Sequence, residues 1–192
     1  DKVDKDFIGR YEQENKYASC LYTTHGHTPE APRVRIVVPL TRDITSDEYA
    51  AITRYFAAEW GIDQFDECSY RPHQLMYWPT TPSNGEYIFK RFDGEWLDPD
   101  EYLEMHPEWR DCSMLPTSSR ESAVIDREIK HLADPLEKEG LIGAFCRTYS
   151  IADAIMTFLS DVYEPTTMDG RYDYIPADSS AGVVVYDDKF IY

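Results

Sequence analysis

Positive charge is scarce in this chain. Its 192 residues include 19 lysines and arginines against 36 aspartates and glutamates, and the formal net charge is −17. Proteins that bind duplex DNA non-specifically need a broad basic surface, so this function is disfavoured. A small positive pocket for an anionic ligand is still compatible with such a balance.

Long apolar runs and paired cysteines are missing too. No run reaches 18 apolar residues, so we expect no membrane-spanning helix. The four cysteines form no C-x-x-C pair, and Cys20 and Cys146 lie in apolar surroundings typical of buried thiols. This usage favours a reducing, cytoplasmic setting. The chain starts at Asp1 without a methionine and stops inside the apolar run 189–192, so we interpret it as a piece of a longer protein.

Several catalytic signatures are absent. The nine glycines include none that opens a helix after a strand, so neither a P-loop nor a dinucleotide-binding fingerprint is present. No G-x-S-x-G motif indicates a Ser/His/Asp hydrolase. Cys68 with His73 lacks the ligand count and spacing of a zinc site. The candidates that are left are polar clusters at strand ends.

The most informative stretch is residues 22–40, YTTHGHTPEAPRVRIVVPL, in which polar residues separate two apolar runs. Residues 18–23 and 34–40 predict two neighbouring strands. Pro29 and Pro32 stiffen their connection by fixing φ and removing two donors. Polar side chains on such a connection stand on a rigid frame and are open to a ligand.

Two histidines and two arginines make that connection a candidate site. Arg33 and Arg35 are two positions apart, so they face the same side of an extended segment. Guanidinium groups beside His25 and His27 suit a polyanion, most simply a phosphate chain. An ordinary hairpin with solvated charges is the alternative interpretation.

Helix signals surround this stretch. Residues 1–17 are charged with a thin apolar stripe, which predicts a short helix packed on a sheet. Thr45 and Glu48 fit a capping box, and the helix that follows should run to Trp60 and stop at Gly61.

The middle of the chain contains two further strand candidates. Residues 75–78 form a short apolar run that predicts a buried strand, and residues 86–92 alternate in polarity and predict its partner. Residues 93–119 contain scattered prolines and predict an irregular connection.

In the second half, Ser118 and Glu121 fit another capping box, whose helix should end near His131 before Pro135. Residues 133–143 are a linker candidate. Ser150 predicts the start of a third helix, and residues 183–192 predict a hairpin. The fold class is therefore α/β (α+β), with a small mixed or antiparallel sheet and flanking helices.

A carboxylate in a loop is the second chemical candidate. Asp66 lies just before the predicted strand 75–78. Carboxylates that bind Mg²⁺ come in twos or threes from separate elements, and two such ions can activate a 3′-hydroxyl and stabilise a leaving group. A solvated loop acid is the alternative.

Together these segments resemble the archaeo-eukaryotic primase (primase-polymerase) domain of phage and prophage primase-helicase proteins, often labelled virulence-associated E. The pattern H-T-P-x-x-P-R-x-R of residues 27–35 is its most specific part. The supporting segments are FD at 65–66, LMYWP at 75–79, SNG at 83–85, GAFCRTYSI at 143–151 and VYDDKF at 185–190.

The resemblance implies an RRM-like primase core over residues 1–119 and a helical and hairpin extension over residues 120–192. It also implies primer synthesis from nucleoside triphosphates on a single-stranded DNA template, with a helicase domain in the same parent chain.

The resemblance also assigns roles to residues. His27, with His25 as a substitute, would contact the triphosphate, and Arg33 and Arg35 would flank the phosphates. Asp66 would be the third acid of a two-metal site for Mg²⁺ or Mn²⁺.

Two departures from the family pattern are visible. The family carries an acid-x-acid pair, and Asp1 fits only as its second member, the first lying before the chain begins. Asp4 and Asp6 have the spacing but lie in a helix-like segment. Gln74 stands where such proteins often have an arginine.

Two other functions stay open at this point. One is a nicking nuclease that uses the His-x-His pair as metal ligands beside a tyrosine nucleophile, although such pairs normally enclose a bulky apolar residue and this one encloses Gly26. The other is a non-catalytic module that binds nucleic acid or a protein partner within a replication protein, which the acidic charge would suit.

Overall fold

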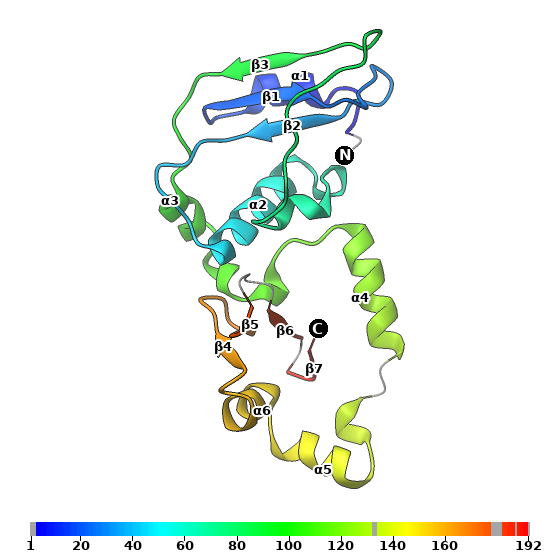
Figure 1. The fold of residues 1–192 in the computed structure, drawn as a ribbon, viewed down its shortest axis with the longest axis vertical. Coiled ribbons are helices and arrows are strands. Elements are labelled where there is room, and N and C mark those ends of the chain that lie inside the picture. Colours follow the sequence, from blue (N-terminus) through cyan, green and yellow to red (C-terminus); the bar gives the residue numbers. More distant parts are fainter. Residues whose placement is uncertain (1–2, 132–133, 178–181, 187, 192) are drawn as a thin grey trace. The chain divides into compact units, whose positions relative to one another are not determined.

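The computed structural model describes residues 3–131, 134–177, 182–186 and 188–191. They form a mixed α+β fold with two small antiparallel sheets (Figure 1), so the predicted class is confirmed. The chain divides into two compact units, residues 1–106 and 107–192. The functional division predicted at residue 119 stays a prediction. Within the described ranges, no helix is long and apolar enough to cross a membrane.

The first unit contains a three-stranded sheet with three α-helices. In chain order its elements are α1 (Phe7–Glu14), β1 (Ser19–Thr23), β2 (Val34–Val37), α2 (Ser46–Trp60), the 3₁₀ turns η1 (Ile62–Gln64) and η2 (Glu67–Tyr70), β3 (Phe89–Phe92) and α3 (Pro99–Glu104). The strand order is β2-β1-β3, and both pairings are antiparallel. The strands predicted at 18–23 and 34–40 and the helices predicted at both ends of this pair are confirmed.

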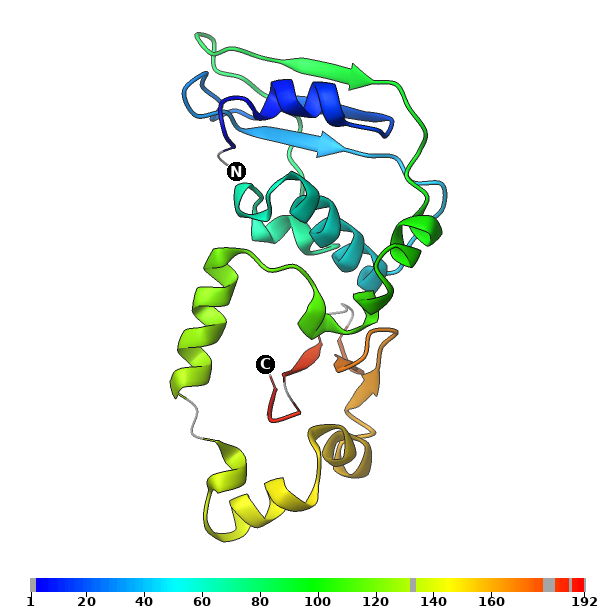
Figure 2. The ribbon, with the colours of Figure 1, turned by 180° about the vertical axis from the view of Figure 1, so that it is seen from behind.

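One face of this sheet packs on α1 (Figures 1 and 2). The Tyr11 hydroxyl donates to Ser19 Oγ at 3.0 Å, and the Tyr11 ring meets Phe92 and Trp60 at centroid distances of 5.2 and 4.7 Å. Leu21, on the same face of the central strand, is fully buried. Burial raises the pKa of Tyr11 to about 12. This aromatic core joins α1, the sheet and the end of α2.

Residues 71–88 cross the other face of the sheet without forming a helix or strand. The predicted buried strand at 75–78 is wrong: Leu75, Tyr77 and Trp78 are 67%, 70% and 89% exposed. Prolines at 72, 79 and 82 remove donors that a strand ladder would need. The partner predicted for it, β3, pairs with β1 instead, with Phe89 opposite Tyr22.

Two helices appear where irregular chain was predicted. In α3, Asp98 accepts from the backbone N–H groups of Asp100 and Glu101, and Pro99 occupies the first turn. In the second unit, α5 (Gly140–Thr148) begins inside the predicted linker 133–143, after the 3₁₀ turn η5 (Pro135–Glu137). Residue 133 of that linker lies outside the described residues.

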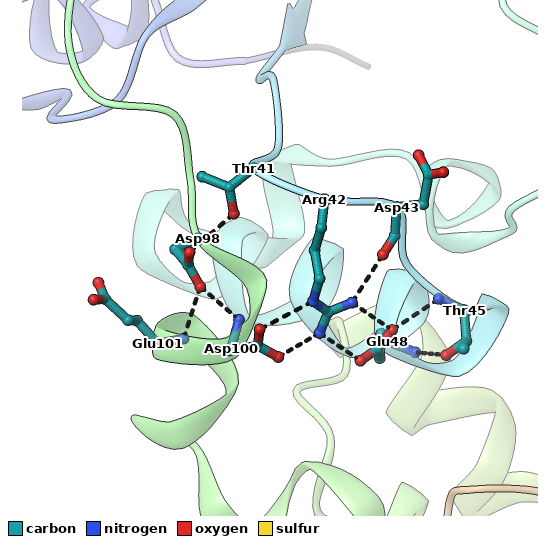
Figure 3. A network of polar contacts seen from close by, with 8 residues as sticks. All are labelled: Thr41, Arg42, Asp43, Thr45, Glu48, Asp98, Asp100 and Glu101. Carbon is teal, nitrogen blue, oxygen red and sulfur yellow. Dashed lines mark hydrogen bonds and ion pairs between the residues drawn. The ribbon is translucent and has the colours of Figure 1, made fainter.

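An ion-pair network joins the first turns of α2 and α3 (Figure 3). The Arg42 guanidinium makes two hydrogen bonds to each of two carboxylates, at 2.6 and 3.1 Å to Asp100 and at 2.8 and 3.2 Å to Glu48. Glu48 is also the second member of the predicted capping box with Thr45, which is confirmed. The hydrogen bonds from Arg42 hold the pKa of Asp100 and of Glu48 below their ordinary values.

This network predicts acid sensitivity. A carboxylate whose pKa is lowered in the folded state stabilises that state above the unfolded pKa, near 4, and loses the effect as pH falls through the folded value. We expect Arg42→Ala to lower the unfolding midpoint by a few degrees at pH 7, and the difference from the parent chain to shrink below about pH 4. Thermal unfolding followed by circular dichroism at several pH values measures this.

Arg91→Ala is the matched control. Arg91 pairs with Asp93, but the two side chains are 78% and 91% exposed, so this pair should contribute little. An Arg42→Ala midpoint that equals the Arg91→Ala midpoint at pH 7 would contradict a stabilising role for the network.

The second unit contains a four-stranded sheet of order β4-β5-β6-β7. Its remaining elements are η3 (Pro107–Arg110), η4 (Cys112–Met114), α4 (Ser119–His131), α6 (Ile151–Phe158), β4 (Tyr163–Pro165), β5 (Arg171–Tyr174), β6 (Val183–Tyr186) and β7 (Phe190–Ile191). The predicted capping box at Ser118 and Glu121 is present, and Ser150 caps α6 as predicted. The hairpin at 183–192 is confirmed for its described residues.

Candidate functional site

The first unit contains a cavity of about 520 Å³ between β2, α2 and the chain that follows α2. Apolar residues of both elements form part of its lining, among them Ile36 of β2 and Ile52 and Phe56 of α2. Polar residues line it from three separate segments. Arg33 and Arg35 come from the start of β2, Asp66 from the turn after α2, and Gln74 from the segment that crosses the sheet.

The two arginines are positioned by the hairpin that was predicted around them. Arg35 pairs with Tyr22 in the ladder, and the Thr24 N–H donates to the Arg33 carbonyl at 2.9 Å just beyond it. The Arg35 Nη1 donates to the Tyr77 carbonyl at 2.5 Å. Both side chains are part-exposed, so the ladder fixes their backbone while their guanidinium groups can still reach a ligand.

Asp66, another residue of the cavity lining, is held by a local turn. Its Oδ1 accepts the Cys68 N–H at 3.0 Å, which caps η2, and the residue is exposed. The cap uses one carboxylate oxygen in one hydrogen bond. The second oxygen is left for a ligand or for water. Asp66 and the two predicted arginines therefore line the same cavity, although the helix α2 separates them in the sequence.

His27 is not part of the cavity lining, although it was predicted beside the phosphates. Its side chain is only 6% exposed, and its Nδ1 accepts the Arg33 N–H at 3.3 Å. Its Nε2 is buried and has no hydrogen-bond partner among the described residues. The role predicted for it stays a prediction, but its imidazole now touches the backbone of an arginine.

His25 lies on the outside of the same hairpin. It is exposed, and its Nδ1 is 3.2 Å from the Thr80 hydroxyl of the crossing segment. Neither histidine lines the cavity. A metal shared by the pair would need both rings to reach one point, and His27 is held in the interior.

Metal ligands are few among the described residues. The described residues include no group of three or more His, Cys, Asp or Glu side chains placed to hold a metal ion. Among the described residues that line the cavity, Asp66 is the one with a carboxylate. Asp1, the other predicted metal ligand, lies outside the described residues. The described donor set alone does not fit a two-metal centre.

Sequence reasoning missed that the crossing segment contributes to the site. Gln74, Leu75 and Met76 line the cavity, while Tyr77 and Trp78 point apolar rings to solvent. The prolines that bracket this segment at 72 and 79 were a signal against a paired strand. An apolar run between prolines is better interpreted as an exposed contact surface.

Comparison with known protein families gives a match over more than half of the chain. The sequence profile of the VapE N-terminal domain matches residues 1–118, which include the whole first unit and the cavity. No curated protein and no solved structure shows significant similarity to the chain.

Proposed function

The chain belongs to the VapE N-terminal domain family, and on that premise we propose that it supplies the nucleotide-binding part of a DNA primase. Such an enzyme is a template-dependent nucleotidyltransferase, here of phage or prophage replication. The observation that supports this is the cavity, which brings Arg33, Arg35 and Asp66 together. Those are three of the residues that the primase resemblance selected.

The arginines provide the phosphate chemistry in this proposal. A guanidinium group donates two parallel hydrogen bonds to a phosphate and keeps its charge at every relevant pH. Two of them at one cavity wall would hold a triphosphate and stabilise charge that develops on the leaving pyrophosphate. The apolar wall from α2 would exclude water from one side of the bound nucleotide, which strengthens those interactions.

The metal ions of primer synthesis, Mg²⁺ or Mn²⁺, need more ligands than the described residues supply. Asp66 would contribute one carboxylate, and the predicted Asp1 would be a second. The single-stranded DNA template and the helicase domain of the parent chain belong to the same proposal. What this unit does by itself is bind and orient the nucleotide.

Primer synthesis by the parent protein tests the proposal. Asp66→Asn keeps an oxygen that can accept the Cys68 N–H, so the turn should survive, but it removes the negative charge. We expect primer synthesis on single-stranded DNA to fall by about two orders of magnitude. The measurement is the yield of labelled primers from nucleoside triphosphates with Mg²⁺ or Mn²⁺.

Asp63→Asn is the control, because Asp63 is an exposed acid of the neighbouring turn η1 and does not line the cavity. Its activity should equal that of the parent. If Asp66→Asn also retained full activity, the assignment of this carboxylate would be refuted.

The exposed crossing segment favours a second candidate function, a module that binds single-stranded nucleic acid. Tyr77 and Trp78 are exposed aromatic rings, and Phe89 of β3 is 57% exposed on the same face of the sheet. The side chains that the strands β2 and β3 place on this face include Arg35 and Arg91. Stacking rings beside cations are the components of single-strand binding sites.

A further inference from the structure

His27 occupies a defined hydrogen-bonding position. The loop between β1 and β2 turns back on itself, since the His27 N–H donates to the Thr24 carbonyl at 2.9 Å and the Ala31 N–H donates to the Thr28 carbonyl at 3.1 Å. This places the imidazole inside the turn, where Nδ1 accepts the Arg33 N–H. A ring nitrogen that accepts an N–H carries no proton itself. The buried Nε2 then carries the ring hydrogen.

Arg33 is the residue that this contact fixes. Its carbonyl is held by the Thr24 N–H, and its own N–H is held by His27, so both backbone groups of Arg33 are bonded across the hairpin. Arg33 is among the residues that line the cavity and His27 is not. The imidazole can therefore influence a bound phosphate through the arginine.

We propose that His27 is a positioning residue for Arg33, which it holds in the orientation that binds the nucleotide phosphates. This rests on the proposed function, because it assumes that Arg33 binds phosphate. Direct contact with a phosphate is disfavoured by the burial of Nε2 and by the 6% exposure of the whole side chain. Of the two hydrogen-bonded residues, Arg33 is the one that lines the cavity.

Three substitutions of His27 test whether Arg33 is positioned by the hydrogen-bond acceptor at Nδ1 or by the volume of the side chain. In His27→Asn the amide Oδ1 can occupy the place of Nδ1 and accept the Arg33 N–H. In His27→Gln the acceptor lies one bond further out, and His27→Leu has no acceptor. We expect the Leu and Gln variants to bind a fluorescently labelled nucleoside triphosphate about tenfold more weakly, as fits the loss of one hydrogen bond. His27→Asn should stay within about twofold of the parent chain.

A double-mutant cycle provides the decisive measurement. If His27 acts through Arg33, His27→Leu should weaken binding in the parent chain but add nothing in an Arg33→Ala background. Binding to the 192-residue chain is followed by fluorescence anisotropy, with inorganic triphosphate as competitor. Circular dichroism of every variant at the same temperature establishes that it is folded.

The outcomes separate the two proposals. Unchanged affinity in Arg33→Ala would overturn the proposed function of this cavity. A loss in Arg33→Ala together with a further full loss from His27→Leu would leave that function intact and overturn the positioning role. Should His27→Leu fail to fold, the Asn and Gln variants decide: equal affinity for these two would refute the requirement for an acceptor at Nδ1.

Discussion

A chain that carries Arg33→Ala and Arg35→Ala together should bind a labelled nucleoside triphosphate at least about a hundredfold more weakly than the parent chain. Each hydrogen bond between ions contributes about 1.5–3 kcal/mol, and the double variant removes both guanidinium groups from the cavity. The backbone pairing of Arg35 with Tyr22 does not depend on the side chain, so β2 should persist. Titration at constant salt measures the loss.

Two controls define what this loss means. Lys90→Ala removes one positive charge from the opposite face of the same sheet, where Lys90 pairs with Glu12 on α1, and it should leave affinity unchanged. Lysine at positions 33 and 35 preserves charge but not the planar fork, so it should restore affinity only in part. Full affinity in the double alanine variant would mean that the triphosphate binds elsewhere or not at all.

Replacing Tyr77 and Trp78 with alanine should lower the affinity for a single-stranded oligonucleotide by about 10–100-fold. Stacking of a base on an aromatic ring contributes about 1–3 kcal/mol. The two rings are 70% and 89% exposed, so their loss removes little packing. The bond from Arg35 goes to the Tyr77 backbone carbonyl and survives the substitution. Anisotropy of a labelled oligothymidylate in low salt is the measurement.

Trp96→Ala is the matched control for this pair. Trp96 is 58% exposed in the same unit but belongs to the segment between β3 and α3. Its loss should not change oligonucleotide binding. Parent-like affinity in the Tyr77 and Trp78 variant would remove the support for a stacking surface and leave the segment as a contact site for protein.

Local chemistry made much of the first unit predictable. The capping box of Thr45 and Glu48 spans four residues, so the start of α2 follows from neighbours in sequence. The two apolar runs and the proline-bounded connection between them likewise predicted the β1–β2 hairpin. The start of α3 was equally local, since Asp98 and Pro99 are an N-cap and a first-turn proline, and the prolines around it obscured that signal.

Pairing partners could not be predicted in the same way. The apolar run 75–78 has the composition of a buried strand, but β1 has two edges only, and β2 and β3 occupy both. Which segment takes the second edge depends on the competition between Phe89–Phe92 and residues 75–78. The prolines decide against the latter, and that outcome depends on the whole sheet.

Some features of the candidate site were likewise predictable from the sequence, and others were not. The two-residue spacing placed Arg33 and Arg35 on one side of a strand, and the resemblance selected Asp66, so the shared cavity could be anticipated. The burial of His27 could not, because it depends on how the turn from Thr24 to Ala31 closes. Sequence spacing predicts on which face of a strand a side chain lies, but it does not predict how buried a loop residue is.

The edge strand β3 has a consequence for how copies of this chain meet. Within the described residues its outer edge has no strand partner, and its central residues are Lys90 and Arg91, which point to opposite faces. Two such edges could add to each other only by bringing like charges together and stripping them of water. Charged residues on an exposed edge are a common protection against aggregation. The four residues of β3 complete the sheet, and their charges disfavour edge-to-edge strand pairing with a second copy of the chain.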